Sequence, residues 1–312
     1  MFSEALSLAI DIPRSPPDWR RLGQHMPFEW IDDALEFEGK ASIRRRRLPA
    51  QQVVWLVIAL ALYRHLSVKE VLDDLDLAMP DMTDRCATAS AACQARQRLG
   101  AEPLRWLFTR SAKAWHEHDS SKFLFRGLNL FAMDGTTLRL ADSAANRAHF
   151  GAQAYAQGKL ASFPQTRGVT LTAVPTHLIL DARFGPYKTN ETTFAKELLP
   201  DIPDHSLTIF DRGFLAADVL CNLADDGVNR HFLIPAKSNT RWTLIEGTTD
   251  DGIVEMKVSD AAMSRDPSLK ATWTARAIRI TTEGTLTYLL TSLTDRKAFP
   301  AKELVACYWR RW

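Results

Sequence analysis

The sequence has little of several features that mark common protein classes. Its 39 Lys and Arg residues stand against 37 Asp and Glu residues, and a net charge of only +2 gives no overall field typical of nucleic-acid binders. With 14 Gly and 15 Pro, collagen-like and wholly disordered chains are excluded. The longest apolar run, Val53–Leu62, is about half of the ~20 residues that a membrane span requires.

Motifs of several enzyme and metal-binding classes are also missing. The four cysteines form no CxxC pair and no metal-ligand spacing, which predicts reduced, mostly buried thiols. We find no glycine-rich nucleotide loop and no nucleophile elbow, so a nucleotide-dependent metabolic enzyme or a serine hydrolase has little support. The first residues carry no basic stretch typical of a secretory signal, and we expect a cytoplasmic protein.

Residues 1–122 predict an all-helical region. Apolar residues recur at helical intervals, Pro49 marks a helix start, and Ser67 with Glu70 has the spacing of a capping box. The expected helices cover Trp19–Glu38, Pro49–His65, Ser67–Leu77, Ala87–Leu99 and Pro103–Trp115.

From about Phe123 the pattern changes to that of an α/β domain. Short apolar runs predict buried strands, Pro175-Thr176 predicts a hairpin, and Phe214–Asp226 predicts a helix. A Thr-, Ile- and Val-rich stretch at about 238–294 predicts further antiparallel strands, and Pro300 opens a last helix.

Two of the predicted strands are followed by an aspartate. FAMDG places Asp134 after one apolar run, where Asp134-Gly135 predicts a turn, and TIFDRG places Asp211 after another. Ligands of open α/β sheets gather at the carboxyl ends of strands, so neighbouring strands would bring both carboxylates to one place. Hard divalent ions prefer such oxygen ligands, and a pair of them supports phosphoryl transfer. The alternative is that each aspartate caps a turn.

Several sequence blocks together resemble one family. The chain resembles the DDE transposases of the insertion sequence four family, which have a ribonuclease H-like core. The resemblance covers nearly the whole chain in the family's order. The blocks are ASIRRRRLPAQQVVWLVIALALYRHLS in the helical region, FAMDGTTLRLADSAANRAHFG around Asp134, LILDARFGPYKTNETTFAKELL with Asn190-Glu191, LTIFDRGFLAADVL around Asp211, and CYWRRW with Tyr308 and Arg311.

The resemblance implies a fold and a chemistry. It implies a helical DNA-binding domain at 1–122 and a ribonuclease H-like α/β core at 123–312 with a β-rich insertion at about 238–294. Asp134 and Asp211 would be the catalytic, metal-binding carboxylates for Mg²⁺ or Mn²⁺ in a two-metal site. The partners would be double-stranded DNA, as transposon terminal inverted repeats and target, with a homodimer formed by the complete enzyme.

The family signature also sets an expectation about activity. Its third carboxylate, a glutamate, lies four residues beyond Arg311, and the sequence in hand stops one residue beyond it. Because in-line displacement is sensitive to errors of ~1 Å, we expect catalysis by this chain to be lost or severely weakened.

Basic and aromatic residues at several positions are candidate DNA contacts. The resemblance implies that Tyr308 and Arg311, which share a helix face, meet the transferred DNA end. The other candidates are Arg167, Lys188, Lys237 and Trp242 near the core, and Arg44, Arg45, Arg46 and Arg47 in the helical region. Simpler alternatives exist for several of them: a solvated loop for the arginine run, a tyrosine packed under the sheet for Tyr308, an arginine paired with an aspartate for Arg311, and core or sheet-surface packing for Trp242.

Two other functions remain open from the sequence. One is a non-catalytic DNA-binding fragment that inhibits transposition by occupying transposon ends. The other is a ribonuclease H-like nuclease unconnected with transposition. Nicking and gel-shift assays on terminal inverted repeats distinguish them.

Overall fold

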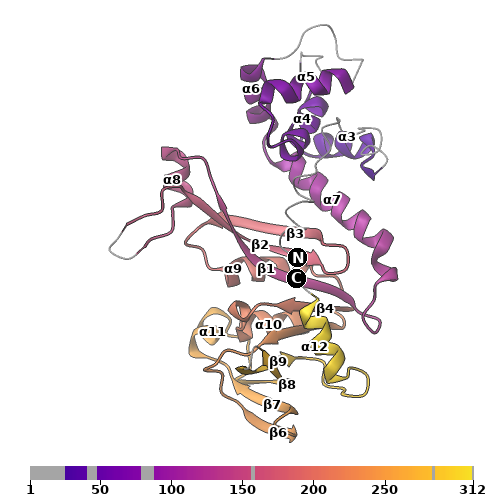
Figure 1. The fold of residues 1–312 in the computed structure, drawn as a ribbon, viewed down its shortest axis with the longest axis vertical. Coiled ribbons are helices and arrows are strands. Elements are labelled where there is room, and N and C mark those ends of the chain that lie inside the picture. The colour runs from indigo at the N-terminus through magenta and orange to yellow at the C-terminus, as the bar shows by residue number, and fades with distance from the viewer. Residues whose placement is uncertain (1–24, 41–47, 79–87, 156–158, 283–284, 311–312) are drawn as a thin grey trace. The chain divides into compact units, whose positions relative to one another are not determined.

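The structure, a computed structural model, describes residues 25–40, 48–78, 88–155, 159–282 and 285–310 (Figure 1). The chain divides into two compact units, Met1–Ser111 and Ala112–Trp312. Each unit has its own hydrophobic core. No helix within the described ranges is both long enough and apolar enough to serve as a membrane span.

The first unit is helical, as its sequence predicts. Helix α4 is apolar nearly all round and buries Val53, Trp55 and Leu56 at its centre. The helices are α3 (Phe28–Phe37), α4 (Ala50–Leu62), α5 (Val68–Ala78), α6 (Ala89–Leu99) and α7 (Glu102–Asp119), the last of which runs into the second unit.

Helix starts in this unit follow from local chemistry. The Ser67 amide donates to Glu70 Oε2 at 2.7 Å and the Glu70 amide donates to Ser67 Oγ at 3.3 Å, which confirms the capping box. Thr88 caps α6 by accepting from the Ala91 amide, and Pro49 is the residue before α4. Helix α4 ends at Leu62, three residues before the expected His65.

The second unit is built on one sheet of nine described strands, in the order β3-β2-β1-β4-β5-β9-β8-β7-β6. Only the β1–β4 and β4–β5 pairs are parallel. The bounds are β1 (Asn129–Arg139), β2 (Gln165–Ala173), β3 (Leu178–Pro186), β4 (Ser206–Phe210), β5 (Arg230–Pro235), β6 (Thr243–Gly247), β7 (Asp251–Lys257), β8 (Thr272–Thr282) and β9 (Thr285–Thr291). The expected β-rich stretch therefore continues the same sheet, and β2 and β3 form the expected hairpin about Pro175-Thr176.

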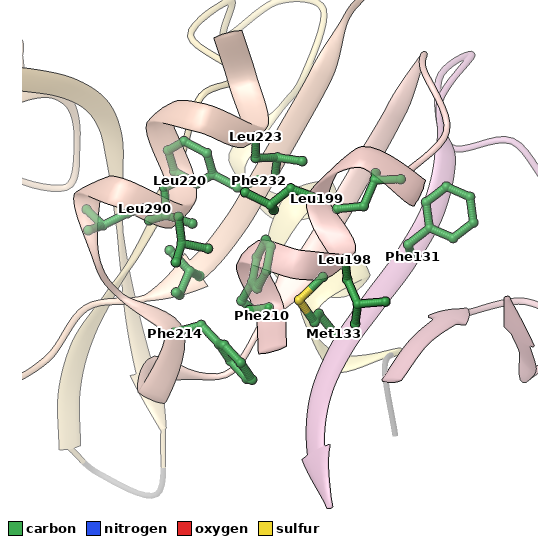
Figure 2. Packing of buried hydrophobic residues seen from close by; sticks show 14 of the residues in the cluster. Phe131, Met133, Leu198, Leu199, Phe210, Phe214, Leu220, Leu223, Phe232 and Leu290 are labelled. Atoms are coloured by element: carbon green, nitrogen blue, oxygen red, sulfur yellow. The ribbon is translucent and has the colours of Figure 1, made fainter. Parts of the chain in front are cut away.

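Helices cover both faces of the sheet. On one face α9 (Glu191–Leu198) and α10 (Ala217–Asp225) pack on Phe131, Met133 and Phe210, as Figure 2 shows. On the other face α12 (Ala301–Trp309) packs on Leu130 and Ile209. Successive strand residues point to opposite faces, which explains why the strand sequences are apolar without interruption. The remaining elements are η1 (Ser120–Lys122), α8 (Ala144–Phe150), η3 (Leu199–Asp201), η4 (Arg212–Phe214) and α11 (Asp260–Arg265).

Two local predictions are wrong. Asp134-Gly135 does not turn the chain, because β1 continues to Arg139 and its far half pairs with β2. The helix expected from Phe214 begins at Ala217, since the residues after Asp211 first form the short turn η4.

The cysteines only partly match the expectation of burial. Cys307 is buried and Cys221 is half-buried, whereas Cys93 is exposed; Cys86 lies outside the described residues. Burial raises the pKa of the Cys307 thiol to about 12 and that of Cys221 to about 11, so neither is a reactive thiolate at neutral pH.

Candidate active site

Strand pairing brings Asp134 and Asp211 together. The parallel register of β1 and β4 pairs Met133 with Phe210. Asp134 is the next residue of β1, and Asp211 directly follows the last residue of β4. Neighbouring strands lie about 4.8 Å apart, so the two backbones carry their carboxylates side by side. Both side chains are partly exposed.

The two aspartates share one face of the sheet. Leu130 and Ala132 on β1, and Ile209 on β4, pack in the cluster beneath α12, so alternation places Asp134 and Asp211 on this side as well. Asp211 keeps an extended backbone at φ −78° and ψ 158°, so the alternation holds through it. The Gly135 amide donates to Asp134 Oδ1 at 2.9 Å and fixes that carboxylate. The pair therefore lies on the face covered by the last helix.

A third carboxylate lies on the opposite face of β1, next to the residue that follows Asp134. Glu191, the first residue of α9, rests on the backbone of Gly135, and a Cβ atom there would lie 2.6 Å from Glu191 Cδ. Asn190 caps the helix by accepting from the Thr192 amide at 3.3 Å, which holds Glu191 at this position. The sequence predicts Asn190 as the cap of a helix from Glu191, which the structure confirms, but it does not predict the contact of Glu191 with Gly135. Gly135 itself gave no usable signal, because Asp-Gly has the local pattern of a turn.

Arg167 accompanies Glu191. It lies on β2 opposite Thr137 of β1, and its Nε is 3.6 Å from Glu191 Oε1. Its guanidinium carbon lies 4.4 Å from the ring centroid of Tyr187, which is a cation–π contact. Lys188, the other basic candidate of this region, is exposed.

A cleft of ≈ 430 Å³ lies on the sheet face covered by α9 and α10, the face opposite Asp211. Its lining includes Leu215, which follows η4, together with Lys237, Trp242 and Trp273. The Lys237 ammonium donates to the Leu215 carbonyl at 3.3 Å, and Trp242 packs edge-on against Tyr288 with ring centroids 5.1 Å apart. Both tryptophans are half-buried, so each has one surface in the core and another along the cleft. Two of the candidate DNA contacts, Lys237 and Trp242, thus line one cleft.

A buried ion cluster fixes the helices around the site. Asp218 of α10 is only 1% exposed and bonds Arg265 of α11 and Lys196 of α9. The Arg265 hydrogen bond, followed by that of Lys196, holds the pKa of Asp218 below its usual range despite burial. Because Lys196 and Glu191 belong to the same helix, the cluster also anchors the helix that carries Glu191.

The remaining predicted residues are not brought to this place by the described structure. Tyr308 is 7% exposed and packs in the core beneath the sheet, on the same face as the two aspartates. Arg311 and Arg44–Arg47 lie outside the described residues. Within the described ranges no group of three or more His, Cys, Asp or Glu side chains is arranged to hold a metal ion.

Comparison with known families covers both units. Residues 16–109 match the family described as insertion element 4 transposase N-terminal, and residues 126–312 match the transposase DDE domain. The chain belongs to the insertion element 4 group of DDE transposases. Divalent metal dependence is a general property of this family, and carboxylates on neighbouring strands, as at Asp134 and Asp211, are a donor set that suits a hard cation.

Two transposases of Escherichia coli K12 are similar to the chain. It is 34% identical to the transposase InsG of insertion sequence element IS4 over 93% of its length, and it spans 65% of InsG. It is 35% identical to the putative transposase InsZ, with 74% of this chain and 76% of InsZ covered. Among solved structures, a cryo-EM piggyBac transposase synaptic complex with hairpin DNA has a TM-score of 0.36 and 13% identity, with 92% of this chain and 62% of that chain covered.

Proposed function

We propose that this protein acts in DNA transposition, through metal-dependent cleavage of transposon ends and strand transfer. The observation that carries the proposal is the register of β1 and β4, which sets Asp134 beside Asp211 where the parallel pairing of the two strands ends. In open α/β sheets, ligands gather at the carboxyl ends of parallel strands. The family assignment supports the same chemistry.

Asp134 and Asp211 would hold Mg²⁺ or Mn²⁺ in a two-metal site. When bound, such ions lower the pKa of an attacking oxygen and stabilise the leaving oxygen in phosphoryl transfer. The protein's own contribution is to fix the two carboxylates, Asp134 through the Gly135 amide and Asp211 through its extended backbone at the end of a fully buried strand. A fixed pair of ligands avoids reorganisation when phosphate arrives.

The basic candidates would contact DNA phosphates away from this pair, with Arg167 and Lys237 on the opposite face of the sheet. Arg167 is already oriented by Tyr187, whereas Lys188 is an exposed cation on the approach to α9. Lys237 and Trp242 would receive a displaced nucleotide in the cleft that begins at Leu215, with the indole as the stacking surface. Arg44, Arg45, Arg46 and Arg47 in the first unit, and Tyr308 and Arg311 of the last helix, remain predicted contacts to transposon ends. A homodimer that pairs two ends belongs to the same proposal.

Metal binding tests the proposal independently of cleavage. We expect Mn²⁺, followed by its electron paramagnetic resonance signal, to bind the wild-type chain and to bind Asp134→Asn and Asp211→Asn at least about tenfold more weakly. Asp142→Asn is a matched control, because Asp142 is an exposed carboxylate paired with Arg147 on the chain that follows β1. Equal Mn²⁺ affinity in all four proteins contradicts the proposed site.

A second candidate is a DNA-binding protein that inhibits transposition without cleaving. Plasmid nicking with Mg²⁺ or Mn²⁺ distinguishes the two functions. Nicking that is abolished by Asp134→Ala supports the enzyme, whereas gel shifts of terminal inverted repeats without nicking support the inhibitor.

A further inference from the structure

Acids lie against both faces of β1 near its middle, Asp134 on one face and Glu191 of α9 on the other, and only Asp134 is explained by metal chemistry. The Glu191 carboxylate lies directly on Gly135, with both oxygens within 2.9 Å of where a Cβ atom would stand. Any side chain at position 135 would push Glu191 away. Glycine at this position therefore admits a carboxylate next to the peptide that follows Asp134.

Arg167 makes fewer hydrogen bonds than a partly buried arginine beside a carboxylate normally makes. Its Nε is buried, yet it donates no hydrogen bond to any described residue, and its distance of 3.6 Å from Glu191 is long for a charge-assisted bond. The planar group is nevertheless oriented by Tyr187, and the side chain is 24% exposed. Arg167 is a preoriented cation whose capacity for anions is only partly used.

We propose that Glu191 is an internal competitor for the DNA phosphate that Arg167 binds. The carboxylate occupies the anion position beside Arg167 when DNA is absent and must be displaced, or share the guanidinium, when a phosphate arrives. This inference rests on the proposed function, because it requires Arg167 to contact DNA. It assigns Glu191 a regulatory contact on the face of the sheet opposite the two aspartates.

The contacts favour competition over a purely structural ion pair. A structural pair in this protein has short bidentate bonds, as between Arg265 and Asp218 at 2.7 and 2.8 Å. The Arg167–Glu191 pair has neither the short distance nor the second bond. With Glu191 37% exposed, its carboxylate can rotate toward water without leaving a buried charge. The pair is therefore held weakly enough for a phosphate to replace it.

The test is the affinity of Glu191→Gln for a short fluorescein-labelled DNA duplex of mixed sequence, measured by anisotropy over a series of salt concentrations. The variant keeps the shape of the side chain and removes the competing charge. We expect about two- to fivefold tighter binding at low salt, the size of a partly exposed ion pair. The slope of log K against log salt should steepen by up to about 0.9, one additional phosphate contact.

Glu197→Gln is the matched control, because Glu197 is an exposed residue of the same helix α9. It removes the same charge at a distance from Arg167 and should bind DNA as the wild type does. In an Arg167→Ala background, Glu191→Gln should change nothing, since the competed cation is gone. Thermal unfolding of each variant establishes that it is folded.

The outcomes separate this inference from the proposal on which it rests. If Arg167→Ala binds DNA as tightly as the wild type, Arg167 contacts no phosphate and both ideas fail at this residue. If Arg167→Ala weakens binding while Glu191→Gln leaves it unchanged or weaker, only the competition is overturned. If Glu197→Gln tightens binding as much as Glu191→Gln, the effect is general charge and the competition is again overturned.

Discussion

The two halves of the sheet share apolar clusters but differ in a buried ion pair. The first half (β3, β2, β1, β4 and β5) is packed on both faces by clusters beneath α9, α10 and α12, to which strands of the second half also contribute. The second half (β9, β8, β7 and β6) contains Arg276, a fully buried arginine that bonds both oxygens of Asp251 at 2.7 Å and the Phe299 carbonyl. Apolar burial is non-directional, whereas a buried ion pair fixes one geometry. The acid pair belongs to the first half.

Removing Phe210 should have the largest effect. Phe210 is fully buried in the first half and directly precedes Asp211. We expect Phe210→Ala to lower the free energy of unfolding by about 3–5 kcal/mol because it leaves a cavity. The same cavity frees the end of β4, so Mn²⁺ binding should weaken as well. Chemical denaturation and Mn²⁺ titration measure the two effects. Phe210→Leu is the control, with smaller losses of both.

Removing Arg276 should destabilise the second half of the sheet without changing the affinity for Mn²⁺. Arg276→Met leaves Asp251 without its principal partner, and we expect a loss of about 3 kcal/mol, the low end for a broken buried pair because Asp251 is 26% exposed. Hydrogen exchange should accelerate in β7, β8 and β9, while Mn²⁺ affinity stays at the wild-type value.

Arg279 provides the comparison for Arg276 on the same strand. It pairs with Asp250, and the two side chains are 47% and 68% exposed. Exposed pairs contribute little, so Arg279→Met should leave unfolding and hydrogen exchange almost unchanged. If Arg276→Met lowers Mn²⁺ affinity as much as Phe210→Ala does, the two halves are not independent and the comparison is wrong.

The sequence predicts the first half better than the second for a physical reason. Apolar runs that end in aspartate are local patterns, so they reveal β1, β4 and the acids that follow them. The Arg276–Asp251 pair joins residues on different strands, and neither residue differs locally from a solvated charge. The pattern at 238–294 therefore indicated strands but not that they extend the same sheet.

The candidate site, like the sheet, could be predicted from the sequence only where local patterns reveal it. Asp134 and Asp211 follow from strand ends and the family blocks, and the register of β1 and β4 brings them together. The contact of Glu191 with Gly135 was not predictable, because the glycine has the local pattern of a turn. Glycine is required at position 135 because Glu191, the first residue of α9, lies against it, and these two residues are far apart in the sequence.

The β5–β9 pair, which joins the two halves of the sheet, should make the free energy of unfolding depend on pH, and this is the smallest of the expected effects. His231 of β5 contacts Ser292 Oγ at 3.0 Å and Asn229 Oδ1 at 2.8 Å, close to the pairing of β5 with β9. Burial lowers the pKa of His231 below its ordinary value. As pH falls below about 6.5 the unfolded chain binds the proton first, so the free energy of unfolding decreases until His231 is also protonated in the folded state. Stability is therefore fully present above about pH 6.5 and is lost on acidification.

Thermal unfolding between about pH 7.5 and pH 5.5 measures this effect. His231→Gln removes the titrating group and should flatten the pH dependence, but not abolish it. Part of the pH dependence should remain because burial also lowers the pKa of His116. The His116 ring packs against Phe131 of the first half, with ring centroids 5.2 Å apart. His116→Gln should remove the pH dependence of stability that persists in His231→Gln. Hydrogen exchange at low pH should accelerate at β5 and β9 in proteins that keep His231 and not in His231→Gln. Acid-induced exchange confined to β1 in the wild type would show that the first half, and not the β5–β9 pair, is the acid-sensitive region.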